Sequence, residues 1–313
     1  MKWYYILLII ILTLLILTFI TSLICYLMVF YNKNKPESSD EIVLPDNEIY
    51  KTHRDLIVSD IKNARKMASK EYTIKSYDNL TLYGKYFESF QNAPIEIMFH
   101  GYRGSGERDL STGIRRAKAC GRNVLIVDQR SHGKSEGHTI SFGIKERYDC
   151  ISWINFVIQE FGNDVEIILT GISMGAATVM MASNLDLPSN VKGILADCGY
   201  DSPRNIIKKY IKDMKLPANI FIPFVKLGAL IFGHFNIDKA SPLESVKNAK
   251  VPIIFIHGET DTFVPCYMSK ILYDNCTSRK KLTIIKDAEH GISYLIDPIT
   301  YVNALEDFFK NEK

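Results

Sequence analysis

The sequence predicts an α/β fold, in which a mostly parallel, mixed β-sheet carries helices on both faces and follows one transmembrane helix. Three observations lead to this prediction. Residues 3–31 carry no charge. In residues 72–86, polar and apolar residues alternate in two runs around a turn, as in a β-hairpin, and the remaining chain alternates short apolar runs with helical stretches. Such strand–helix alternation is typical of parallel sheets covered by helices. The 313 residues leave room for one large domain after the N-terminal run.

The N-terminal run is long enough to be a membrane anchor. About 20 apolar residues suffice to cross the hydrocarbon core as a helix, and the uncharged run 3–31 is longer. The aromatic cluster 3–5 at one end, and Tyr26 and Tyr31 at the other, suit the two membrane interfaces. A cleaved signal peptide is the alternative, but its apolar region would be shorter, about 7–15 residues, and end in an A-x-A pattern that is missing here. We therefore expect residues 1–32 to form an uncleaved single-pass anchor. The Lys and Arg counts favour the cytoplasmic side for the rest of the chain, but by only about two charges, so the side is left open.

A linker and a helix follow the anchor. Residues 34–47 contain prolines, serines and acids, which indicates a polar tether. Apolar residues then recur at helical spacing between 48 and 70. We assign 33–70 to this tether and leading helix, and 71–313 to the α/β domain.

Eight short segments are predicted strands. The first two, 72–75 and 80–86, alternate around a turn at 77–79 and indicate an antiparallel hairpin. The other six are β-branched runs of the kind found in strands buried on both faces. These six lie at 95–99, 123–127, 166–170, 193–196, 253–256 and 282–285.

Helices are predicted between these strands, at 107–119, 143–161, 176–183, 265–275 and 299–310. One apolar stretch, 202–248, is too long for a simple crossover. Because Pro217 and Pro223 interrupt it, we expect two or three short helices that form a cap over the carboxyl edge of the sheet. An ordinary packed helical insertion is the alternative to a cap that covers substrate.

Composition and charge exclude several classes of protein. Hydrophobic residues make up 47% and charged residues 23% of the chain, which is a globular balance. The net charge of +3 is too small to indicate a nucleic-acid partner, and no basic tract interleaved with aromatics occurs. The six cysteines are scattered without a C-x-x-C pair. We expect free thiols, rather than a metal site or a disulfide framework.

The strongest local motif is Gly171-Ile172-Ser173-Met174-Gly175. It follows a predicted strand directly and opens an apolar helix, which is the context of a nucleophile elbow. Small residues are needed on both sides of the serine because the turn is sharp. The motif therefore predicts that Ser173 is a nucleophile presented above the sheet.

A serine nucleophile needs a base, and the base needs an acid that orients it. In this arrangement the acid and then the histidine follow the serine in the chain. Asp261 comes just after the strand 253–256, and His290 just after the last strand. Since both lie at the carboxyl edge of the sheet, we expect Asp261 to be the acid and His290 the base, with Glu259 as the next candidate acid.

An oxyanion needs N–H donors that are already in place. The backbone N–H of Met174, directly after the nucleophile, is one expected donor. The loop 100–106 after the strand 95–99 is rich in glycine, and we expect the backbone N–H of Tyr102 to be the second donor. A phosphate-binding loop is the rival interpretation, but no G-K-[ST] follows.

Taken together, the sequence resembles the α/β-hydrolase superfamily, in the branch of monoacylglycerol-lipase-like and serine-aminopeptidase-like enzymes. The resemblance runs from about residue 71 to the C-terminus and implies this fold and a Ser–His–Asp triad, but no particular substrate. In that family the loop after the second parallel strand, here 128–135, is usually structural. Ser131 in this loop stands where relatives often carry glycine. The motifs that resemble the family are 100–102, 128–135, the elbow at Ser173, 258–261 and 290–291.

We therefore expect a membrane-anchored serine hydrolase that cleaves carboxylic esters through an acyl-enzyme. The apolar cap and the anchor favour a small-molecule or lipid-like acyl substrate, and the chemistry requires no metal or cofactor. Two alternatives remain open at this point: a serine peptidase or amidase with the same triad, and a non-catalytic, membrane-tethered binding protein.

Overall fold

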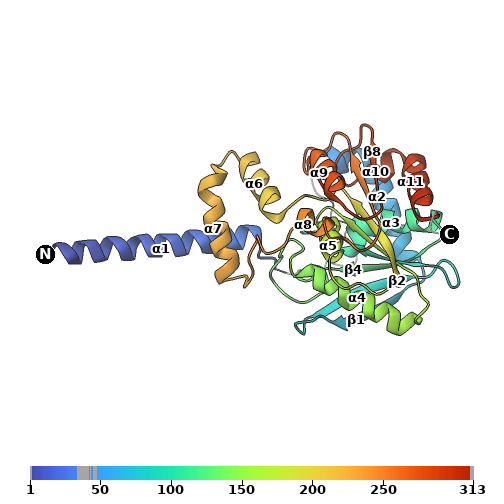
Figure 1. The fold of residues 1–313 in the computed structure, drawn as a ribbon, viewed down its shortest axis with the longest axis horizontal. Coiled ribbons are helices and arrows are strands. Elements are labelled where there is room, and N and C mark those ends of the chain that lie inside the picture. Colours follow the sequence, from blue (N-terminus) through green and yellow to red (C-terminus); the bar gives the residue numbers. More distant parts are fainter. Residues whose placement is uncertain (1, 34–41, 43, 45–47, 311–313) are drawn as a thin grey trace.

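The computed structural model describes residues 2–33, 42, 44 and 48–310, and its centre is an eight-stranded sheet with helices on both faces (Figure 1). The strand order is β1-β2-β4-β3-β5-β6-β7-β8. β1 and β2 pair antiparallel, as do β2 and β4, and all other neighbours are parallel. The predicted α/β fold with a mostly parallel, mixed sheet is thus confirmed. The strands are β1 Lys70–Lys75, β2 Thr81–Phe87, β3 Ile95–Phe99, β4 Asn123–Asp128, β5 Ile167–Ile172, β6 Val191–Asp197, β7 Ile253–Gly258 and β8 Lys280–Ile285.

The central strands are apolar throughout because both of their faces are buried. In β4, Leu125 and Val127 belong to the core on one side of the sheet. Val124 and Ile126 belong to the core on the other side, as the two-residue period of a strand requires. The six predicted parallel strands all form, some of them two residues longer at an end than predicted.

Two layers of helices cover the sheet. The layer on one face consists of α4 Glu146–Phe161, α5 Met174–Ala182, α8 Pro242–Val246 and α9 Tyr267–Asn275. The other face carries α2 Glu48–Lys66, α3 Gly106–Ala119, α10 Ser293–Ile296 and α11 Pro298–Lys310. The helix predicted at 48–70 ends at Lys66, because β1 begins at Lys70.

The stretch 202–248 forms α6 Pro203–Asp213, α7 Ala218–Ile231 and α8, which agrees with two or three short helices. One expectation is wrong: Pro223 does not interrupt the stretch but lies inside α7. A proline removes one backbone donor, and here the loss falls on the exposed side of the helix, away from the packed core. Pro217 does mark a boundary, since it precedes the first residue of α7.

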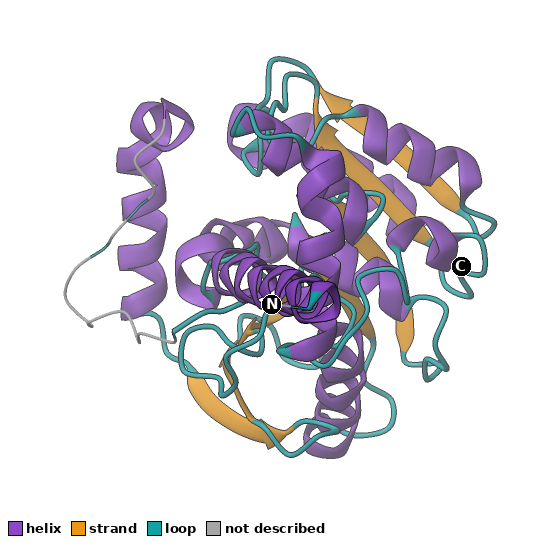
Figure 2. Ribbon diagram, turned by 90° about the vertical axis from the view of Figure 1, so that its left-hand side faces the viewer, coloured by secondary structure: helices purple, strands orange, loops and turns teal. Residues whose placement is uncertain are grey.

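The N-terminal run is a single helix, α1 Trp3–Val29, long and apolar enough to cross a membrane; signal sequences pass the same test. All side chains from Trp3 to Leu17 are exposed. The C-terminal end of α1 instead packs against α7 and reaches the body of the molecule (Figure 1). Figure 2 looks along α1 from its N-terminal end and shows it standing out in front of the sheet. Most of the predicted tether, 34–41, 43 and 45–47, lies outside the described residues.

Candidate active site

Ser173 occupies a sharp turn between β5 and α5. Its backbone has φ 56° and ψ −113°, in a region that L-residues rarely adopt. The flanking glycines make the turn possible. A Cβ on Gly171 would lie 2.1 Å from the backbone of Gly175, and a Cβ on Gly175 would lie 2.0 Å from the carbonyl oxygen of Phe99. Any larger residue at either position would push the strand and the helix apart.

Asp261 and His290 come together although they are far apart in the sequence. The His290 Nδ1 lies 2.7 Å from the Asp261 Oδ2. Asp261 follows β7 and His290 follows β8, two neighbouring parallel strands, so both residues reach the same carboxyl edge. The Asp261 Oδ1 accepts hydrogen bonds from the backbone N–H groups of Phe263 and Val264, at 2.9 and 2.8 Å. These two bonds fix the orientation of the carboxylate.

A second histidine, which the sequence analysis left aside, also contacts this carboxylate. The His257 Nε2 lies 3.1 Å from the Asp261 Oδ2 and 2.8 Å from the Val264 carbonyl oxygen. Both neighbours are acceptors, so Nε2 carries the proton and the Nδ1 accepts from the Ser269 hydroxyl, 2.6 Å away. Burial disfavours the charged carboxylate, but the hydrogen bonds from His257 and His290 outweigh it and hold the pKa of Asp261 well below its ordinary value.

Because Asp261 is ionised, it only accepts, and the His290 Nδ1 must donate to it. The His290 Nε2 is then the free, unprotonated nitrogen of the ring. The His290 ring also packs against the Phe263 ring at an interplanar angle of 43°, with centroids 4.8 Å apart, which limits its rotation. Glu259, the other candidate acid, is exposed to solvent.

Two further histidines near the site have structural roles. The His100 Nε2 accepts from the Gln129 backbone N–H at 3.0 Å, and the His132 Nε2 accepts from the Arg103 N–H at 3.1 Å. Burial lowers the pKa of both imidazoles, which keeps them neutral and able to accept. Neither is available as a base for Ser173.

The loop at 128–135 holds the neighbouring turn in place. The Asp128 carboxylate accepts from the backbone N–H of Gly106 at 2.8 Å and of Lys134 at 2.9 Å. Ser131 has φ 67°, a backbone conformation that glycine adopts more readily. These contacts support the structural role that the resemblance implied for this loop.

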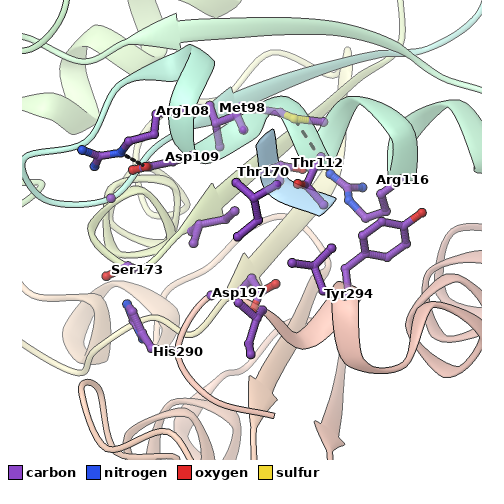
Figure 3. Close-up of a pocket in the computed structure, with 18 of the residues that line it drawn as sticks. Met98, Arg108, Asp109, Thr112, Arg116, Thr170, Ser173, Asp197, His290 and Tyr294 are labelled. Atoms are coloured by element: carbon purple, nitrogen blue, oxygen red, sulfur yellow. Dashed lines mark hydrogen bonds and ion pairs between the residues drawn. The ribbon is translucent and has the colours of Figure 1, made fainter. Parts of the chain in front are cut away.

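Ser173, His290 and Tyr102 line one cavity of about 280 Å³ (Figure 3). Figure 3 shows Ser173 and His290 close together at one end of it, with Asp197 and Tyr294 toward the other end. Met174 begins α5, so its N–H is one of the first donors of the helix, which have no partner within it. Apolar side chains form much of the wall, among them Met98, Leu110, Ile172, Ile292 and Leu295.

One group of side chains could in principle hold a metal. Among the described residues, Cys198, Asp261 and His290 offer ligand atoms within 4.8 Å of one another. Burial raises the pKa of the Cys198 thiol well above its ordinary value, which disfavours the thiolate that a metal needs. The hydrogen bond between Asp261 and His290 already explains why these two groups lie together. All six cysteines are free, as expected.

The strand order, the turn at Ser173, and the residues after β7 and β8 define the α/β-hydrolase fold. Comparisons with known proteins agree. The profile of the serine aminopeptidase S33 family matches residues 82–220. In solved structures, an esterase from Pyrococcus furiosus superimposes with a TM-score of 0.65 at 23% identity, over 90% of this chain and 98% of that one.

Curated relatives match a smaller part of the chain. The chain is 27% identical over 192 residues to protein YqkD of Bacillus subtilis, which is 61% of this chain and 63% of that protein. It is 24% identical over 200 residues to the lysophosphatidylserine lipase ABHD12 of Danio rerio, which is 63% of this chain and 51% of that protein. The matches thus span about half to two thirds of these relatives. The chain therefore has the α/β-hydrolase fold, and it is similar in part to proteins named as a serine aminopeptidase, an esterase and a lipase.

Proposed function

We propose that the chain is a membrane-anchored serine hydrolase that cleaves carboxylic esters, with Ser173 as nucleophile, His290 as base and Asp261 as the orienting acid. One observation carries this proposal. Ser173 lies on a strained turn and lines the same cavity as His290. The His290 Nδ1 is hydrogen-bonded to the Asp261 carboxylate at 2.7 Å, which leaves the Nε2 for Ser173. The N-terminal helix is the proposed anchor.

The proposed reaction runs in two halves. As the Ser173 Oγ attacks the ester carbonyl, the His290 Nε2 takes its proton, and Asp261 stabilises the imidazolium that forms. The backbone N–H groups of Met174 and Tyr102 are the proposed donors to the oxyanion. Collapse of the tetrahedral intermediate releases the alcohol, which takes the proton from His290. Water then attacks the acyl-enzyme, with His290 as base again, and frees the carboxylic acid and Ser173.

The preference for esters rests on the apolar side chains that line the cavity and on the proposed membrane anchor. The apolar side chains around Ser173 suit an acyl or alcohol group without charge. A peptidase with the same triad is the second candidate, favoured by the match to the serine aminopeptidase family and by the fold of an acylaminoacyl peptidase from Pyrococcus horikoshii, with a TM-score of 0.56.

A substrate comparison separates the two candidates. Purified full-length protein is assayed with nitrophenyl esters of short and long acyl chains and with aminoacyl nitroanilides, alongside Ser173→Ala as the control. The proposal predicts that esters are cleaved with a higher kcat/KM and that Ser173→Ala is inactive on all of them. Preferential cleavage of the anilides would replace the ester assignment with the peptidase one.

A further inference from the structure

The outer face of the cap helix α7 is apolar from end to end. Its only charged residue, Lys226, is ion-paired with Asp238 at 2.7 Å. The side chains that remain exposed or half-exposed at helical spacing form what we name the α7 stripe, with Ile220 at 60%, Leu230 at 43% and Ile231 at 40% exposure. The α7 stripe consists of Ile220, Pro223, Phe224, Leu227, Leu230 and Ile231. An uninterrupted apolar face of this kind needs a partner.

The anchor helix sets the level at which α7 lies. The exposed part of α1, together with its first half-exposed residues, runs from Trp3 to about Ile20. Eighteen residues at about 1.5 Å each give about 27 Å, close to the hydrocarbon thickness of about 30 Å. The first ring contact with the body lies at the end of this stretch, where the rings of Phe19 and Phe232 have centroids 5.3 Å apart. The body therefore begins where the hydrocarbon ends.

α7 occupies that level and runs across α1 (Figure 1). The two helices touch at Gly228, where a Cβ would lie 2.4 Å from the Ser22 carbonyl oxygen and 3.1 Å from the Tyr26 Cβ. Such close contact fixes the depth of α7 relative to α1. In Figure 1, α7 is the part of the body nearest the N-terminal end of α1, so a bilayer around α1 meets α7 first.

We propose that the α7 stripe lies in the surface of the lipid bilayer, with its side chains among the upper acyl chains. The inference rests on the membrane anchoring proposed for α1 and adds a second, in-plane contact. A helix that lies in the membrane interface places its apolar face about 5–10 Å into the boundary. The opposite side of α7, with Ile222 and Val225, is covered by the body, so only the α7 stripe is left to face the lipid. The cap and the neighbouring site would then open beside lipid, the expected source of an apolar acyl substrate.

Fluorescence quenching by brominated lipid tests this contact in the full-length protein. In wild type, Trp3 reports on α1 and Trp153 is buried. A Trp3→Phe background then receives either Ile220→Trp in the α7 stripe or Ile299→Trp on α11, the helix at the opposite end of the molecule (Figure 1). Ile299 is 74% exposed. Vesicles contain phosphatidylcholine brominated near the top of the acyl chain.

The proposal predicts that Ile220→Trp loses fluorescence in these vesicles and Ile299→Trp does not. If brominated lipid quenches the two variants to the same extent while it quenches Trp3 in wild type, the α7 contact is overturned and the anchor is left intact. An unquenched Trp3 in wild type would overturn the anchor and the α7 contact together. Neither result depends on whether the protein is an esterase, which the substrate assay measures separately.

A different set of contacts connects the end of α1 to the loop that carries Tyr102. The Tyr102 hydroxyl donates to the Val29 carbonyl oxygen at 2.8 Å. The Arg103 Nη2 donates to the Met28 carbonyl oxygen at 2.8 Å. The last carbonyls of a helix have no partner within it, so they are free to accept from this loop.

Packing holds this junction together. Phe30 is fully buried and meets the rings of Phe142 and Phe235, with centroids 5.8 and 5.1 Å away. The Tyr102 ring lies 5.1 Å from that of Phe142. The backbone N–H of Ile140 donates to the Phe30 carbonyl oxygen at 2.8 Å. The end of α1 thus packs directly against the loop that carries Tyr102, next to Ser173.

We infer that α1 positions the Tyr102 N–H for the oxyanion, through the hydrogen bond from the Tyr102 hydroxyl to Val29. This second inference rests on the oxyanion role proposed for Tyr102. Tyr102→Phe removes only the hydroxyl and keeps the ring and the backbone N–H. Tyr26→Phe is the matched control, because its hydroxyl also links α1 to the body, through Thr139 at 2.7 Å, but does not touch the loop.

Both variants are made in the full chain and compared with wild type on a nitrophenyl ester and with a trifluoromethyl ketone that mimics the tetrahedral intermediate. We expect Tyr102→Phe to lower kcat and the affinity for the ketone by about the same factor, of order tenfold, with KM little changed. Tyr26→Phe should stay within about twofold of wild type. Equal behaviour of the two variants, in a protein that cleaves esters, would overturn this inference while leaving the hydrolase assignment in place.

Discussion

Asp261→Asn removes one charge from the proposed triad and keeps the size of the side chain. In the protein, one carboxylate oxygen accepts from two backbone N–H groups, and the other faces the N–H groups of His290 and His257. An asparagine has only one oxygen, which the two backbone donors retain. Its amide NH₂ then points at His290, so the Nδ1 must accept rather than donate.

The reversed hydrogen bond puts the proton of the neutral His290 ring on Nε2, the nitrogen that is proposed to take the proton of Ser173. The ring can then no longer act as a base. The variant also loses the charge that stabilises the imidazolium. In a triad of this kind the wrong tautomer lowers kcat by about 10⁴. We expect a loss of that order here, with KM changed far less.

The assay measures kcat and KM for a nitrophenyl ester with the wild type, Asp261→Asn and Glu259→Gln. Glu259→Gln changes the neighbouring acid, which is exposed and was the other candidate, and should retain full activity. Circular dichroism checks that all three proteins are folded. A kcat of Asp261→Asn within tenfold of wild type would refute the assignment of Asp261, and a large loss in Glu259→Gln would move the acid to that residue.

Three further outcomes are expected. His257→Leu should lower kcat about tenfold by removing a hydrogen bond to Asp261, and His257→Gln, which keeps an N–H donor, should recover part of the loss; equal kcat values for the two would refute this role. Gly175→Ala should destabilise the protein by roughly 3 kcal/mol or more in a thermal unfolding experiment, since its Cβ would lie 2.0 Å from the Phe99 carbonyl oxygen; an unchanged Tm would contradict that clash. Hydrogen bonding by Arg204 lowers the pKa of Asp238 to about 2, so its stabilisation is complete above the unfolded value of about 3.9 and is lost as the pH falls through about 2. Because the pair is partly exposed, Asp238→Asn should cost less than about 1 kcal/mol at pH 7 in a denaturant titration, and progressively less as the pH falls through about 2.

The sequence was sufficient for the sheet because its strands have a clear local pattern. Runs such as 123–127 are apolar at every position, which only a strand buried on both faces or a short buried helix segment explains. The turn at Ser173 was predictable for a similar reason, since glycines at two fixed positions are required by contacts with backbone atoms. The order of acid and histidine then followed from the order of the strands.

Long-range contacts could not be read from local patterns. His257 lies within a strand and gave no sign that it would meet Asp261, because the contact depends on how the following loop folds back. Pro223 suggested a break, but it lies on the exposed side of α7, and the helix continues through it. The helix α10 is only four residues long, too short to show a helical period.

The largest difference between expectation and structure concerns the end of α1. An uncharged run predicts a membrane helix, and nothing in its composition indicates that its last turn packs beside Tyr102. The sequence analysis placed Tyr26 at a membrane interface and gave Phe30 no particular role. In the structure they are buried against the body.

Labelling with a fluorophosphonate probe tests the central claim, that Ser173 is an activated nucleophile, most directly. Membranes containing the full-length wild type or Ser173→Ala are treated with the probe, and covalent labelling is measured on a gel. The account predicts that the wild type is labelled and Ser173→Ala is not. No labelling of folded wild type, or equal labelling of both proteins, would contradict it.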